Sequence, residues 1–193
     1  MYNLTIAYIA SFCAMFVTTS SYFFKKKLMY LIFQLSAIVF LILSYFFTLE
    51  FVAMIGIGVG LFRVLVYLFY ENKQRIAPLY WAFIFSVLTI MAYFVGSTLK
   101  ESGQSYYDIL YVLSLCMFAF IFRIRDIKLV RYLCLIPLIM SALYNILINA
   151  PIFATLSYVF ETLANVSAII FYAVKYNKPQ IISIKKENTD ENN

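Results

Sequence analysis

One arginine and one glutamate lie deep inside apolar stretches of this 193-residue chain. A charged side chain in a hydrocarbon core is costly, so it usually faces the interior of a helix bundle. At 1.5 Å per helical residue, Arg63 lies about 10 Å from one end of its stretch, and Glu161 lies about 13 Å from the opposite end of its own. In a core about 30 Å thick these depths differ by about 6 Å. We therefore expect Arg63 and Glu161 to pair in at least one state. The alternatives are a pure packing clamp, or an Arg63 that extends to the headgroups.

Neutral polar side chains at similar depth add to this pair. With it they give six candidate residues for binding a small polar solute: Arg63, Asn145, Glu161, Asn165, Gln34 and Tyr158. For each of the neutral amides, a hydrogen bond between helices is the alternative use. Glu161 is the only acid at midspan depth and would therefore carry the proton if transport were coupled to protons.

Other reactive chemistry has little support in the sequence. The chain has no histidine, and its three cysteines, Cys13, Cys116 and Cys134, are isolated within or beside apolar stretches. These residues show no spacing typical of a metal site. Phosphate-binding glycine loops and nucleophile elbows are absent from the sequence. Catalysis would need more converging titratable groups than one arginine and one glutamate. We therefore expect no catalytic, cofactor or metal site, and a protein that is not an enzyme.

Apolar helices must position the candidate residues. Hydrophobic residues make up 64% of the chain and charged residues 12%, and a soluble domain would not expose so much apolar surface to water. A helix of about 20 apolar residues crosses a bilayer. Gly56 and Gly60 lie one turn apart in the third stretch, where small residues let another backbone approach. We predict an all-α, polytopic membrane helix bundle with seven transmembrane helices, at residues 4–22, 28–47, 51–70, 79–98, 106–122, 129–148 and 152–174. The fifth stretch is the shortest.

Basic residues follow every second helix, and this pattern predicts the orientation. They are Lys25, Lys26 and Lys27, then Lys73 and Arg75, then Arg123, Arg125, Lys128 and Arg131, and finally Lys175, Lys178, Lys185 and Lys186. Because basic loops stay on the cytoplasmic side, we expect the N-terminus outside and the C-terminus in the cytoplasm. The net charge of +6 then reflects orientation and contact with anionic lipid headgroups, with no nucleic-acid partner. Residues 179–193 are polar and predict a disordered cytoplasmic tail.

The sequence also has signs of an internal repeat within a single transmembrane domain, residues 1–178. Lys27 and Leu28 open one helical hairpin, and Lys128 and Leu129 open another. The closing pairs are Asn72-Lys73 and Asn177-Lys178, which makes the second copy four residues longer. We place that difference at the turn 149–151. The prediction is two parallel three-helix units, residues 1–73 and 106–178, joined by a linker helix at 79–98. Parallel repeats of this kind recur in transporters.

Aromatic side chains make up 20% of the chain and gather near the ends of the helices. This group comprises Tyr22, Tyr70, Tyr80, Trp81, Tyr106 and Tyr107, with Tyr30, Tyr45 and Tyr144 similarly close to ends. Such a distribution is typical of an interfacial aromatic belt. Stacking on a ligand is the alternative.

Several of these features resemble the YgjV-type family of small bacterial inner-membrane proteins. They are the basic loop 25–27, the third helix with Arg63, Tyr144 beside Asn145, and Asn165 in the seventh helix. The resemblance extends over about residues 23–178. It implies a multi-pass protein of the bacterial cytoplasmic (inner) membrane.

The three-plus-one-plus-three plan also resembles the SWEET sugar transporters, the PnuC vitamin-precursor transporters and the KDEL receptor. This resemblance implies a central pocket between two three-helix bundles. SWEET proteins use an asparagine in the third helix of each bundle. Asn165 suits that role in the second unit. In the first unit, the repeat spacing puts Gly60 at the matching position.

Two classes of function follow. A small-solute transporter with alternating access predicts a water-filled central cavity lined by Arg63, Asn145, Glu161 and Asn165. A non-transporting receptor or scaffold predicts the same residues tied to one another without a cavity. The expected partners are membrane lipids and, for a transporter, a small polar solute; a homo-oligomer is compatible with either class.

Overall fold

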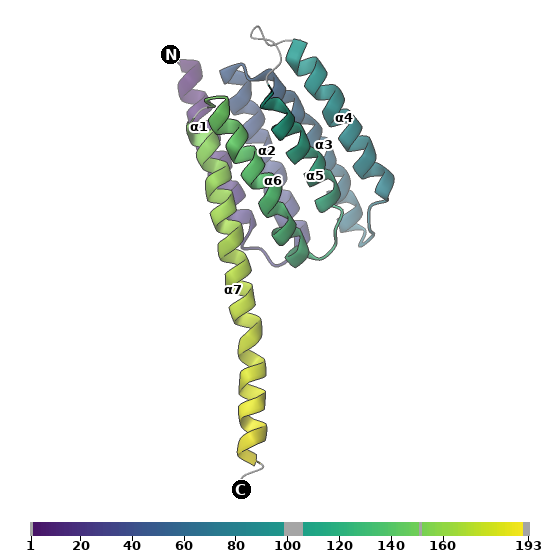
Figure 1. Ribbon diagram of the computed structural model, residues 1–193, viewed down its shortest axis with the longest axis vertical. Coiled ribbons are helices and arrows are strands. Elements are labelled where there is room, and N and C mark those ends of the chain that lie inside the picture. The colour runs from purple at the N-terminus through teal and green to yellow at the C-terminus, as the bar shows by residue number, and fades with distance from the viewer. Residues whose placement is uncertain (1, 99–105, 151, 191–193) are drawn as a thin grey trace.

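Seven α-helices make up the computed structural model, which describes residues 2–98, 106–150 and 152–190 (Figure 1). The helices are α1 (Tyr2–Ser21), α2 (Lys27–Thr48), α3 (Phe51–Asn72), α4 (Leu79–Thr98), α5 (Asp108–Ile121), α6 (Ile127–Leu147) and α7 (Ile152–Asp190). The described ranges contain no strand. The predicted all-α fold class is therefore confirmed.

Six of the seven helices are long and apolar enough to cross a membrane. The exception is α5, which has 14 residues and a length of about 21 Å, against a hydrocarbon core of about 30 Å. It begins at Asp108 rather than at the predicted residue 106, and it ends at Ile121. The composition and length of the other six support a multi-pass membrane protein.

The outer surface of the bundle is apolar. Phe16, Phe62, Leu163 and Ile170 expose 68%, 64%, 57% and 57% of their area, and they lie on three helices, α1, α3 and α7. Monomeric soluble proteins rarely expose large contiguous apolar patches. This surface therefore suits contact with lipid.

Six of the helices form a closed ring. Each of α1, α2 and α3 packs on the next, α3 packs on α5, and α5, α6 and α7 continue the series until α7 packs on α1. The remaining helix, α4, lies at the edge of the bundle against α3 and α5 (Figure 1). Consequently α1 and α7, the first and last helices of the chain, are neighbours.

Two glycines allow close contacts of α3. A Cβ atom on Gly96 of α4 would lie 2.8 Å from the Cα atom of Val52. A Cβ atom on Gly56 would lie 2.9 Å from the Leu115 side chain of α5. Small residues at such points let helices approach closely, so Gly56 has the packing role that its spacing predicts.

The pattern of buried residues in α2 recurs in α6 at an interval of 100 residues. Matching buried positions include Tyr30 and Val130, Leu31 and Arg131, Gln34 and Cys134, Leu41 and Ser141, and Tyr45 and Asn145. Left-handed residues end both helices, with φ 59° at Leu49 and 53° at Asn149. The two helices thus present the same face to the interior and turn at the same point.

Burial in α3 recurs in α7 at an interval of 101 residues. The interval therefore grows by one residue across the turn between α6 and α7. The sequence predicts a difference of four residues at this turn. The pair Asn177-Lys178 lies inside α7, which continues past the position that matches the end of α3. Gly60 accordingly corresponds to Glu161, not to Asn165 as the repeat spacing had suggested.

The last helix is longer than predicted. It continues to Asp190, so the helix includes most of the segment for which we expected disorder. Residues 179–190 contain no glycine, and they include Gln180, Lys185, Lys186 and Glu187, which are residue types of good helix propensity. Extending an existing helix also avoids the cost of nucleation. Residues 191–193 of the predicted tail lie outside the described residues.

Candidate functional site

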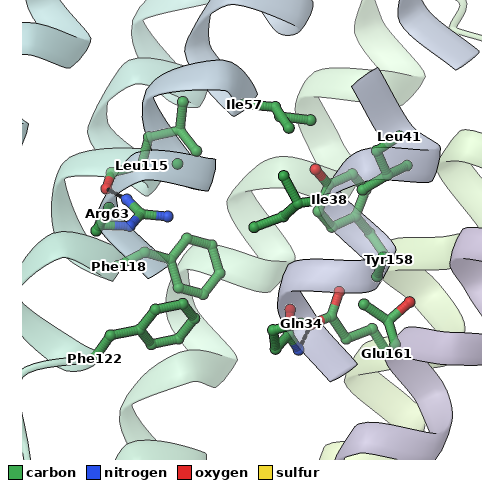
Figure 2. A pocket seen from close by; sticks show the side chains of 13 residues that line it. Gln34, Ile38, Leu41, Ile57, Arg63, Leu115, Phe118, Phe122, Tyr158 and Glu161 are labelled. Carbon is green, nitrogen blue, oxygen red and sulfur yellow. Dashed lines mark hydrogen bonds between the residues drawn. The ribbon is translucent and has the colours of Figure 1, made fainter. Parts of the chain in front are cut away.

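A cavity of about 50 Å³ lies inside the helix ring. By this measure a water molecule needs roughly 10–15 Å³, so the cavity has room for a few water molecules. Its polar lining residues are Thr18, Gln34, Arg63, Tyr158 and Glu161, from α1, α2, α3 and α7. Aliphatic and phenyl side chains form the rest of its wall (Figure 2). Four of the six predicted binding residues therefore meet at one cavity.

Glu161 receives hydrogen bonds from α1 and α2. The Tyr22 hydroxyl donates to Glu161 Oε1 over 2.8 Å, and Gln34 Nε2 donates to the same oxygen over 3.1 Å. Gln34 Nε2 also donates to Ser21 Oγ over 3.2 Å. The carboxylate is 6% exposed, and its described partners are neutral groups.

Arg63 is held by α5. Its Nη1 donates to the Leu115 carbonyl over 2.6 Å, and its Cζ lies 5.8 Å and 5.5 Å from the ring centres of Phe118 and Phe122. Such distances permit cation–π attraction. The Nε atom is buried and has no hydrogen-bond partner in the described structure. The residue is 3% exposed, so the guanidinium does not extend to the headgroups.

Arg63 and Glu161 face the same cavity but are not paired in this structure. Each is bonded to other residues, and no ion pair joins them within the described ranges. Figure 2 shows the two side chains on different sides of the cavity, with Ile38 between them in the view. Both residues line one cavity, and their pairing in another state stays a prediction.

Asn145 and Asn165 do not line the cavity. Asn145 accepts a hydrogen bond from the Tyr45 hydroxyl over 3.2 Å and donates to the Ala154 carbonyl over 3.4 Å. Asn165 donates to the Arg131 carbonyl over 2.7 Å. Both amides form hydrogen bonds between helices, which is the alternative to solute binding.

Tyr22, for which the sequence predicts a place in the aromatic belt, is a residue of the site. It is fully buried and bonded to Glu161, and Tyr30, Tyr45 and Tyr144 are also at most 1% exposed. By contrast, Tyr80, Tyr106 and Tyr107 are exposed, as a belt requires. A signal for the burial of this end of α1 exists in its small residues, which recur at helical spacing: Ala7, Ala10, Ser11, Ala14, Thr18 and Ser21. Such a stripe marks a packed face.

Arg131 positions Tyr22. We expected Arg131 to be a cytoplasmic loop charge, but it is 2% exposed. Its Nη2 donates to the carbonyls of Tyr22 and Phe24 over 2.8 Å and 2.7 Å, and its Cζ lies 4.5 Å from the Tyr172 ring centre. Carbonyls at the end of a helix lack intrahelical partners. Arg131 supplies them with donors and so fixes the segment that carries the Tyr22 hydroxyl.

The described residues bring together no group of three histidine, cysteine, aspartate or glutamate side chains that would hold a metal ion. Comparison with protein-family models, curated proteins and solved structures gives no match to this chain. The resemblance to YgjV-type proteins therefore rests on the sequence features that carry it.

Proposed function

We propose that this protein is a small-solute transporter of the bacterial cytoplasmic membrane. The observation that carries the proposal is a largely apolar cavity within the helix ring whose wall contains the charged residues Arg63 and Glu161 without an ion pair between them. A buried charge without a charged partner is costly in a structure that serves packing alone. In a transporter, both groups are available to a solute.

The arrangement of the helices supports alternating access. We propose that α1–α3 and α5–α7 are two parallel units, with the N-terminus outside and the C-terminus in the cytoplasm. A serine pair joins the first two helices of each unit: Ser11 with Ser44 at 3.0 Å, and Ser114 with Ser141 at 2.9 Å. The units meet where α1 packs on α7 and α3 packs on α5. Rocking of one unit against the other would open the cavity to each side in turn, as in other repeat transporters.

A non-transporting receptor or scaffold is the second candidate. It is favoured by Asn145, Asn165 and Arg131, whose hydrogen bonds tie helices together rather than face the cavity. A receptor would use the same cavity to bind a ligand that never crosses the membrane.

Transport is tested by reconstituting the full chain in liposomes and measuring counterflow of radiolabelled small polar solutes. We expect one solute class to exchange across the membrane and Arg63→Gln to abolish that exchange. Arg75→Gln is the matched control, because it removes the same charge from an exposed residue. A solute that binds the purified protein but never exchanges would favour the receptor.

A further inference from the structure

We propose that the cavity binds a small zwitterion, with its anionic group at Arg63 and its ammonium group at Glu161. The role of the zwitterion as a transported substrate rests on the proposed function, whereas its binding does not. The inference follows from the hydrogen bonds that each charged side chain still lacks, and from the size and lining of the space between them.

The Arg63 guanidinium can accept an anion. It carries five N–H donors in a planar fork that matches a carboxylate. One donor atom, Nη1, is engaged by the Leu115 carbonyl, while Nε is buried without a partner in the described structure. A buried unsatisfied donor costs about 1–3 kcal/mol. An incoming carboxylate would remove this cost and add a charge-assisted bond.

Gly60 leaves room beside this donor group. It lies one helical turn before Arg63 and lines the same cavity. A Cβ atom at Gly60 would lie 3.4 Å from Arg63 Nη2. Any side chain at this position would therefore compete with a ligand for the space next to the guanidinium.

The Glu161 carboxylate can accept a cation. Its described hydrogen bonds from Tyr22 and Gln34 both end on Oε1. A carboxylate has about four acceptor sites on its two oxygens, so Oε2 is available to a further donor. Within the described residues, no lysine or arginine nitrogen lies within the 4.0 Å limit of an ion pair to Glu161. An ammonium group would supply both the donor and the opposite charge.

The remaining wall favours a short solute with both charges. Ile38, Leu41, Ile57 and Leu115 also line the cavity, and aliphatic walls suit a methylene chain. A volume of about 50 Å³ corresponds to on the order of four water molecules, which matches the smallest amino acids.

A solute with a single charge fits this site less well. An anion at Arg63 would sit in the same low-dielectric cavity as the uncompensated carboxylate of Glu161. A cation at Glu161 would likewise sit near the charge of Arg63. Like charges repel strongly where water is scarce. A zwitterion instead neutralises both groups and adds no net charge to the membrane interior.

The test is calorimetric titration of the full-length protein, purified in detergent, with glycine, β-alanine and γ-aminobutyrate. Propionate and ethylamine serve as matched probes, because each keeps only one of the two charges. We expect at least one of the three zwitterions to bind and both probes to bind more weakly by a factor of about ten or more, which corresponds to 1.4 kcal/mol. Arg63→Gln and Glu161→Gln should each abolish binding of the zwitterion, and Arg75→Gln should not.

Two results on wild-type protein would overturn the inference whether or not the variants fold. One is that none of the three zwitterions binds, and the other is that propionate or ethylamine binds as tightly as the best of them. Counterflow of the same compounds in liposomes separates the two proposals. A zwitterion that binds without exchange supports this inference and contradicts transport. Exchange of a singly charged solute without zwitterion binding supports transport and contradicts this inference.

Discussion

Tyr22 donates a hydrogen bond to Glu161 Oε1 over 2.8 Å and thereby joins the residue that follows α1 to the first third of α7. The backbone of Tyr22 is in turn held by Arg131 of α6. A buried carboxylate is thus positioned by a neutral hydroxyl, and the hydroxyl is positioned by an arginine that never touches the acid. The position of Glu161 at the cavity therefore depends on three helices.

Removing the Tyr22 hydroxyl should destabilise the protein. In Tyr22→Phe, Glu161 Oε1 keeps only the Gln34 donor of the two described. Hydrogen bonds between membrane helices contribute about 0.6–2 kcal/mol, so we expect a loss of that size in the free energy of unfolding. The measurement is thermal or denaturant unfolding of the purified full-length protein. Tyr132→Phe removes the same atom from an exposed residue of α6 and should change little. Equal effects of the two changes would contradict the role given to Tyr22.

Gly96→Ala should weaken the contact between α4 and α3. The new Cβ would lie 2.8 Å from a backbone atom of Val52, and backbone cannot move aside as a flexible side chain can. Overpacking of this kind typically costs about 1–3 kcal/mol. Gly58→Ala is the control, because nothing lies within 4 Å of its Cβ position and alanine favours a helix by up to about 1 kcal/mol. If Gly96→Ala unfolds at the same temperature as Gly58→Ala, then α4 does not lie as close to α3 at Gly96 as described.

Gly60→Ala should separate binding from stability. Its methyl group would make ordinary contact with Arg63 Nη2 at 3.4 Å, so the fold should tolerate it. The same methyl group occupies space beside the guanidinium, and we expect weaker solute binding in calorimetric titration. Gly58→Ala again serves as control and should bind as wild type does. Unfolding of Gly60→Ala as early as Gly96→Ala would instead assign Gly60 to packing.

A charge exchange tests whether Arg63 and Glu161 approach each other in another state. Arg63→Glu and Glu161→Arg should each abolish counterflow, since each leaves two like charges at one cavity. If the residues pair during transport, the double variant should recover part of the lost exchange. A double variant as inactive as both single variants, although inserted in the membrane at the wild-type level, would argue against pairing.

The orientation can be read with reporter fusions. Alkaline phosphatase is active outside the cytoplasmic membrane, whereas green fluorescent protein fluoresces inside the cell. We expect fluorescence and no phosphatase activity for fusions after Asn193. Fusions after Asn149, at the turn that follows α6, should show the opposite. Phosphatase activity at the C-terminus would reverse the orientation that the basic loops predict.

Helix positions were largely predictable from the sequence. The predicted linker helix, residues 79–98, matches α4 at both ends, because hydropathy records where a helix enters and leaves the apolar layer. Depth along each helix also brought Arg63 and Glu161 to one cavity. The length of α5 was less predictable, since Tyr106 and Tyr107 extend its apolar run beyond the helix that forms.

Rotation of each helix about its own axis was harder to predict. In a bilayer both the lipid-facing and the buried sides of a helix are apolar, so the polar face that orients a helix in a soluble protein is missing. This explains why Tyr22 was assigned to the interface and Asn165 to the cavity. Side-by-side order was unpredictable for the same reason: the contact of α1 with α7 joins segments that no local pattern relates.

That contact also sets an order of events during synthesis. Tyr22 and Gln34 lie 139 and 127 residues before Glu161 along the chain. When α1 and α2 leave the ribosome and enter the membrane, their acceptor Glu161 has not yet been translated. Their polar groups must rely until then on water, on headgroups or on each other, as Gln34 does with Ser21. The ring closes only when the final helix is inserted, so a nascent chain stopped before α7 holds two donors of the site without their acceptor.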